Sequence, residues 1–123
     1  MLRNLWKNAT FYCLNHDKPI PLYVIETSMT PFYACPKYML KDETHPDGHE
    51  RDESGCGNHL SFQDSYKIME KFNNIIEDSL ANDEMIDFTG LRFKYKSIQV
   101  KILKYSDDKI DIGITNSKTQ KVH

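Results

Sequence analysis

The residues Ser61–Leu80, SFQDSYKIMEKFNNIIEDSL, carry the clearest secondary-structure signal in this chain of 123 residues. Ser61 and Asp64 form an S-x-x-D capping box, in which the serine oxygen accepts a hydrogen bond from a backbone N–H of the first helical turn. Apolar residues then recur at steps of three and four, which places them on one face of a helix. They are Phe62, Tyr66, Met69, Phe72, Ile76 and Leu80. The pattern predicts a central α-helix over about residues 61–82 with one buried face.

Three short segments after the predicted helix have the alternation of β-strands. Leu91–Lys96 alternates apolar with basic residues, and Ile98–Ile102 alternates apolar with polar residues. The phase of the alternation changes near Ser97, so we expect a tight turn or a bulge there. Isoleucines at every second position of Ile110–Ile114 form the third segment. We therefore expect a three-stranded antiparallel meander that packs against the helix.

The half of the chain before the helix has no helical periodicity. Pro21–Ser28 (PLYVIETS) alternates like a strand, and an aromatic run, Pro31–Tyr38 (PFYACPKY), follows it closely. Together they predict a short antiparallel pair, which a polar, charged loop follows over residues 41–55. The fold class is therefore α+β. We expect two lobes, residues 1–60 and residues 61–123, packed as one unit.

The composition is that of a folded protein, with 39% hydrophobic and 28% charged residues. The formal net charge of −2 does not by itself indicate a nucleic-acid partner. No apolar run is long enough to span a membrane, and the first residues lack the apolar core of a secretory signal. We therefore expect a cytoplasmic protein without membrane contact. A reducing compartment disfavours disulfides, so the three cysteines point to metal binding or to a reactive thiol.

Five residues in the first half of the chain have the chemistry of metal ligands. They are Cys13, His16, Cys35, Cys56 and His59. The pairs Cys13-x2-His16 and Cys56-x2-His59 have the spacing at which a tight turn presents two ligands to one ion. Four tetrahedral positions leave two ligand sets open. One set uses both pairs, and the other uses all three thiolates with His16.

The segment Phe32–Tyr38, FYACPKY, resembles the third-ligand segment of the topoisomerase-type C-terminal zinc ribbon. In that family a first C-x2-C pair opens a hairpin, a segment of the form G-x-F-x-x-C-x-x-Y-P-x-C follows, and four thiolates hold one zinc ion. Phe32 falls on the family's aromatic position, Cys35 on the third ligand and Tyr38 on the tyrosine. The layout of the chain also resembles small zinc-ribbon proteins of mobile elements in Gram-positive bacteria.

The resemblance covers about residues 11–58 and departs from the family at two ligands. Cys13 and His16 fall on the first pair, with histidine in place of the second cysteine. The fourth cysteine of the family follows the third within a few residues, whereas Cys56 comes only after the acidic loop Asp42–Glu53. A loop can be inserted there at a small cost, because closure entropy grows only logarithmically with loop length.

The resemblance implies a zinc-ribbon-like lobe over residues 1–60 that holds one structural zinc ion. Its ligands would be Cys13, His16, Cys35 and Cys56, with His59 as the alternative ligand. Four protein ligands leave no coordination position for water, so such a site stabilises the fold and performs no Lewis-acid chemistry. The sequence also lacks a Walker or dinucleotide-binding motif. We therefore expect a protein that is not an enzyme.

Ribbons of the topoisomerase type bind single-stranded DNA, so the resemblance implies a nucleic-acid-binding accessory factor. Stacking on aromatic rings and contacts between cations and phosphates are the physical basis of such binding. The candidate contacts are Tyr33, Lys37 and Tyr38 on the hairpin and Arg92, Lys94 and Lys96 on the meander. The acidic loop opposes this reading, because it would repel phosphate. The alternative is a zinc-stapled protein-protein interaction module that binds no nucleic acid.

Overall fold

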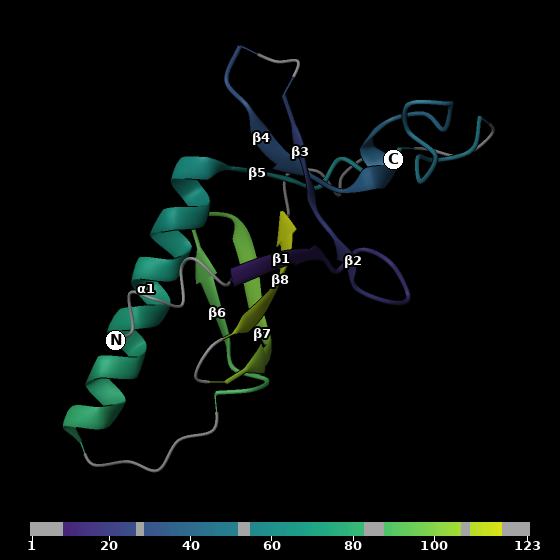
Figure 1. Ribbon diagram of the computed structural model, residues 1–123. Helices are drawn as coiled ribbons and strands as arrows, with labels where there is room; N and C mark the ends of the chain where they lie inside the picture. Colours follow the sequence, from purple (N-terminus) through teal and green to yellow (C-terminus); the bar gives the residue numbers. More distant parts are fainter. Residues whose placement is uncertain (1–8, 27–28, 52–54, 83–87, 107–108, 117–123) are drawn as a thin grey trace.

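Two β-sheets and one long α-helix make up the part of the chain that the computed structural model describes (Figure 1). The described residues are 9–26, 29–51, 55–82, 88–106 and 109–116. The larger sheet has five strands, β1 (Ala9–Cys13), β2 (Ile20–Pro21), β6 (Arg92–Tyr95), β7 (Ile98–Tyr105) and β8 (Ile110–Asn116). The smaller sheet has three, β3 (Tyr23–Ile25), β4 (Phe32–Ala34) and β5 (His59–Ser61). The helix α1 spans Phe62–Ala81, and a 3₁₀ turn, η2, spans Pro36–Tyr38. The predicted α+β class is confirmed.

The helix α1 begins at the predicted capping box. The Oγ of Ser61 accepts a hydrogen bond from the backbone N–H of Asp64 at 3.0 Å. The buried face of α1 consists of Ile68, Met69, Phe72 and Ile76. The prediction of burial is wrong at the two ends of this face, because Phe62, Tyr66 and Leu80 are 43%, 49% and 62% exposed. The helix extends at both ends past the sheet surface that could cover them (Figure 1).

The five-stranded sheet has the order β2-β1-β8-β7-β6 and is mixed. Strands β6, β7 and β8 are antiparallel neighbours in chain order, as the alternation predicts. The phase change near Ser97 is a two-residue connection between Tyr95 and Ile98, with Lys96 in the left-handed region at a φ of 55°. The three-stranded meander that the sequence predicts is not confirmed as the whole of this sheet. Strand β1 extends it by pairing with β8 in parallel, and β2 then pairs with β1 in antiparallel.

Most of the hydrophobic core lies between α1 and one face of the five-stranded sheet. Phe72 of the helix is fully buried, and its ring lies 6.4 Å from that of Phe93 on β6. Strand β1 contributes Phe11, which is paired in register with Ile112 of β8. Because side chains alternate along a strand, the residues between these apolar positions point to the opposite face of the sheet. No described helix or strand packs on that opposite face.

The three-stranded sheet forms from the segments that the sequence predicts as an antiparallel pair. Tyr23 pairs with Ala34 and Ile25 with Phe32, and β5 then adds to the free edge of β4. This sheet lies beyond the N-terminal end of α1, because β5 leads directly into the helix (Figure 1). That the pair is the hairpin of a zinc ribbon stays a prediction. The division at residue 60 also stays a prediction, although β1 and β2 join the sheet of the second half.

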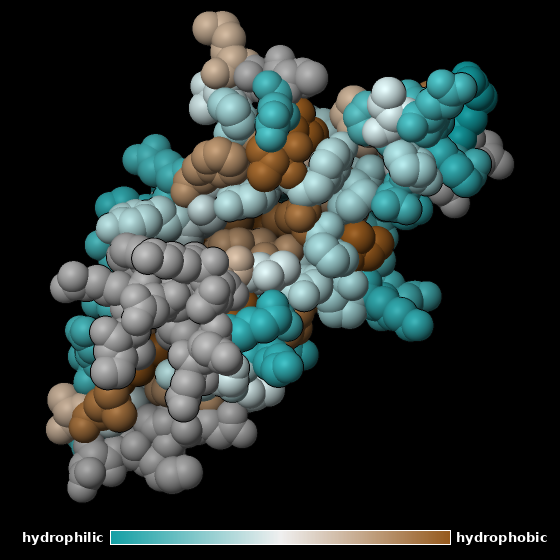
Figure 2. Space-filling view, viewed as in Figure 1, coloured by the Kyte–Doolittle hydropathy of each residue, from teal (hydrophilic) through white to brown (hydrophobic). Residues whose placement is uncertain are grey.

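The predicted polar loop after η2 closes on itself. The N–H of Lys41 donates to the carbonyl of His49 at 2.8 Å, and the N–H of His49 donates to the carbonyl of Met39 at 2.9 Å. Gly48 is required between them, because a Cβ there would lie 2.4 Å from the Met39 carbonyl oxygen. Figure 2 shows mainly hydrophilic residues over this part of the surface. The loop therefore forms a polar lobe beside the small sheet.

Candidate metal centre

Four of the five predicted metal ligands come together at one point. The ligand atoms of Cys13, His16, Cys35 and Cys56 all lie within 4.8 Å of one another. The Sγ atoms of Cys13 and Cys56 are 3.7 Å apart, and the Sγ of Cys35 is 3.3 Å from Nε2 of His16. Three sulfur atoms and one imidazole nitrogen at such distances are consistent with one metal site.

The four residues reach this point from both sheets. Cys13 is the last residue of β1, in the five-stranded sheet, and His16 follows it in the connection to β2. Cys35 directly follows β4 and caps η2, and Cys56 lies in the segment that leads into β5. The cluster therefore lies at the junction of the two sheets. Cys13 and Cys35 are fully buried, whereas Cys56 and His16 are half-buried.

The cysteine sulfur atoms accept hydrogen bonds from nearby N–H groups. The buried Asn58 side chain donates to the Sγ of Cys13 at 3.1 Å, and the N–H of Lys37 donates to the Sγ of Cys35 at 3.4 Å. Asn15 donates through its backbone to Cys13 at 3.4 Å and through its side chain to Cys56 at 3.6 Å. Such outer contacts orient ligands and stabilise negative charge on sulfur. No motif or spacing in the sequence indicates this role for Asn15 or Asn58.

The three thiols influence one another's ionisation. Hydrogen bonds with Cys13 and with Cys56, and then burial, raise the pKa of the Cys35 thiol. Hydrogen bonds from Cys13 and Cys35 lower the pKa of Cys56. The pKa of Cys13 is raised: its hydrogen bond with Cys35 lowers it, but the contact with Cys56 and burial together outweigh that effect. A metal cation bound here would displace the protons that these thiols hold.

The alternative ligand His59 lies outside the cluster. Its Nδ1 is 2.9 Å from the carbonyl oxygen of Gly57, to which it donates a hydrogen bond in the matching tautomer. Its ring makes edge contacts with Phe32 and Tyr38, at centroid distances of 5.9 and 6.4 Å. His59 therefore belongs to an aromatic group on the small sheet. The structure brings together the set of three cysteines with His16, and not the set that needs His59.

The hairpin residues predicted to contact nucleic acid are only partly accessible to a ligand at the surface. Tyr33 is half-buried and packs between Phe11 and Phe62, at centroid distances of 5.9 and 4.8 Å. The Nζ of Lys37 donates to the carbonyl of Gly48 at 3.3 Å, in the polar loop. Tyr38 is 39% exposed. Of these three residues, Tyr33 thus packs against the core, and its ring is not open for a base to stack on it.

The basic residues predicted on the meander divide between two places. Arg92 and Lys94 are exposed on the face of the five-stranded sheet that α1 does not cover. Lys96 is at the turn after β6 and forms an ion pair with Asp64 of α1, at 3.5 Å. The six predicted contacts therefore do not form one continuous surface.

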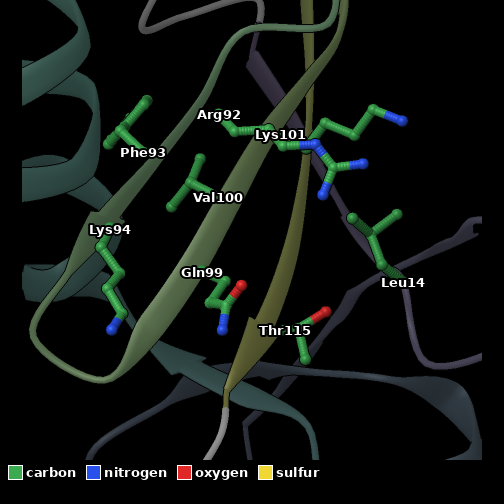
Figure 3. A pocket seen from close by; sticks show the side chains of 8 residues that line it. All are labelled: Leu14, Arg92, Phe93, Lys94, Gln99, Val100, Lys101 and Thr115. Carbon is green, nitrogen blue, oxygen red and sulfur yellow. The ribbon is translucent and has the colours of Figure 1, made fainter.

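A shallow groove of about 400 Å³ runs along the open face of the five-stranded sheet (Figure 3). Its lining residues are Leu14, Arg92, Phe93, Lys94, Gln99, Val100, Lys101 and Thr115. Arg92 and Lys101 extend toward the side where Leu14 lies, while Phe93 and Val100 point away toward the core (Figure 3). Among the described residues, no carboxylate forms an ion pair with Arg92, Lys94 or Lys101.

Comparison with known proteins identifies no relative. Within the described ranges, no helix has the length and apolar character that crossing a membrane requires. No protein-family model, no curated protein and no solved structure matches this chain.

Proposed function

We propose that this chain is a non-enzymatic protein that one structural zinc ion stabilises and that binds nucleic acid as an accessory factor. The observation that carries the proposal is the cluster of Cys13, His16, Cys35 and Cys56 at the junction of the two sheets. Such a cluster would hold the two sheets together. The cations on the open sheet face then provide a surface for phosphate.

The donor set fits zinc in particular. Thiolate and imidazole are the ligands of structural zinc sites, which are almost always four-coordinate. Four protein ligands leave no position for a catalytic water, so the ion would contribute to folding and not to chemistry. A cytoplasmic location agrees with this role, because a reducing compartment keeps the three thiols available to a metal.

Nucleic-acid binding can be tested by fluorescence anisotropy with short labelled oligonucleotides at low salt. We expect binding whose affinity falls steeply as salt rises, because neutralised phosphates release their counterions. If the zinc-loaded protein binds neither single strands nor duplexes at low salt, this part of the proposal is wrong.

The alternative function, a zinc-stapled protein-protein interaction module, rests on apolar side chains at the surface. Val24, Phe62 and Tyr66 are 37%, 43% and 49% exposed on β3 and α1. Exposed apolar residues of this size are common at interfaces, although single ones also occur on monomers. A zinc-loaded protein that fails to bind any nucleic acid would favour this alternative.

A further inference from the structure

The open face of the five-stranded sheet has a regular distribution of side chains. In the sheet register, Pro21, Tyr12, Gly113, Lys101 and Arg92 form one row across all five strands. The aromatic ring is on β1, the glycine on the central strand β8, and the two cations on β7 and β6. A second row places Thr115, Gln99 and Lys94 beside it. In these two rows the uncharged side chains lie mainly on β1 and β8, and the cations lie on β7 and β6.

One side of the groove is apolar, because the side chain of Leu14 lies there over a glycine. A Cβ at Gly113 would lie 2.6 Å from three side-chain carbons of Leu14, so the leucine occupies the space that a side chain at 113 would fill. The N–H of Leu14 donates to the carbonyl of Ile114 at 3.1 Å, which fixes the leucine beside β8. Tyr12 is half-buried and points to the same face, because Phe11 and Cys13 on either side of it are buried in the core.

The charge of this face favours an anionic occupant. Arg92, Lys94 and Lys101 have no carboxylate partner among the described residues. Asp111 lies on the same strand as Gly113, but its Oδ1 is 3.0 Å from the Nζ of Lys109, which neutralises it. A groove with cations along one side and the apolar Leu14 along another attracts a ligand that has both phosphate and an exposed flat apolar group.

We propose that a single strand of nucleic acid lies across this face, with phosphates along Arg92, Lys94 and Lys101 and with a base on Tyr12 and Leu14. The inference rests on the proposed function and identifies its surface, which lies mainly outside the hairpin. A duplex fits less well, because its bases are stacked inside and its backbone would leave Tyr12 and Leu14 without a partner. A single strand can contact the cations and these two side chains together.

The test compares groove variants with matched controls, using labelled single-stranded oligothymidylate and a duplex of the same length. Arg92→Gln with Lys101→Gln removes two groove cations, and Arg51→Gln with Lys67→Gln removes the same residue types from the loop and from α1. We expect the groove variant to bind the single strand at least about tenfold more weakly and to lose about 1.4 from the slope of log affinity against log salt. The control should bind like the unchanged protein.

A second comparison tests the base contact. Tyr12→Ala should weaken binding of the single strand by about tenfold with an unchanged salt slope, because stacking is lost and no charge is removed. Tyr66→Ala, on α1, should leave affinity unchanged. Zinc content and thermal unfolding of each variant show that it is folded before its affinity is compared.

The possible outcomes separate this inference from the proposed function. If the unchanged protein binds no nucleic acid, the proposed function itself fails. If it binds the single strand, and if the Arg92→Gln/Lys101→Gln variant and the Tyr12→Ala variant bind that strand as tightly as the unchanged protein, the assignment of this face is wrong and the proposed function stands. If it binds the duplex as tightly as the strand, and Tyr12→Ala has no effect, the proposed occupant is wrong.

Discussion

Asn58 shows how a single residue connects the metal centre to the sheet. It is fully buried, and its Nδ2 donates to the Sγ of Cys13 at 3.1 Å and to the carbonyl of Ile114 at 3.0 Å. Its Oδ1 accepts from the N–H of Asn116 at 3.2 Å. Three hydrogen bonds offset the cost of burying an amide. The residue therefore couples the position of Cys13, in the candidate metal centre, to the end of β8.

The choice between Cys35 and His59 as a ligand gives the sharpest test at the residue scale. We expect Cys35→Ser to lose zinc, because its sulfur is part of the cluster, and His59→Ala to retain it, because its ring lies among Phe32 and Tyr38. Metal analysis of the purified variants would measure this directly, against one zinc per chain for the unchanged protein. The opposite pattern would show that both histidines bind the metal and Cys35 does not.

The four residues of the cluster could be predicted from the sequence, but the residues that hydrogen-bond to them could not. Spacing of two intervening residues and a shortage of cysteines elsewhere are visible in the chain itself. Spacing alone did not separate Cys35 from His59, because His59 has the favourable spacing from Cys56 whereas Cys35 was favoured only by the family resemblance. Asn58 could not be found in this way, since it meets Cys13 and Ile114 across 45 and 56 residues of sequence. Only the fold brings such partners together.

Among the elements, α1 was the most predictable because its signals are local. Its cap and its apolar steps lie within one segment, whereas pairing of β1 with β8 joins Ala9 to Ile110. Strand β1 is five residues long and has no turn that would mark it. The alternation therefore predicts the antiparallel order of β6, β7 and β8 but not the parallel strand that extends them. The prediction that both ends of the apolar face of α1 are buried was wrong for a related reason. Periodicity shows which residues share a face of the helix, but not how much of that face other elements cover.

The cap of α1 makes a prediction at the element scale. Ser61→Ala removes the acceptor for the N–H of Asp64 and should lower the free energy of unfolding by about 1 kcal/mol. Ser65→Ala is the control, because its exposed hydroxyl only donates to the carbonyl of Phe62 within the helix. Urea unfolding of the two zinc-loaded variants measures the difference. Equal effects of the two substitutions would mean that the cap contributes nothing specific.

At the scale of the whole molecule, the candidate metal centre adjoins the small sheet, which has fewer buried apolar residues than the large sheet. Each strand of the small sheet is three residues long, and the sheet buries Leu60 and Ala34 with few other residues. Sheets of this size need a helix or a cross-link for stability. A metal ion held by the cluster would supply one, because Cys13 belongs to the large sheet while Cys35 and Cys56 adjoin the small one. The metal should therefore stabilise the small sheet more than the large one.

Removal of zinc tests this unequal dependence. A strong chelator should lower the free energy of unfolding by on the order of 3 kcal/mol, because an ion that binds only the folded state stabilises it by mass action. Amide hydrogen exchange should then rise first in β3, β4 and β5, while β6 and β7 stay protected beneath α1. Restoring zinc should restore protection. The Cys35→Ser variant is the control, since a chelator should not change the unfolding of a protein that has already lost the metal. Uniform loss of protection across both sheets would show instead that the ion supports the whole fold equally.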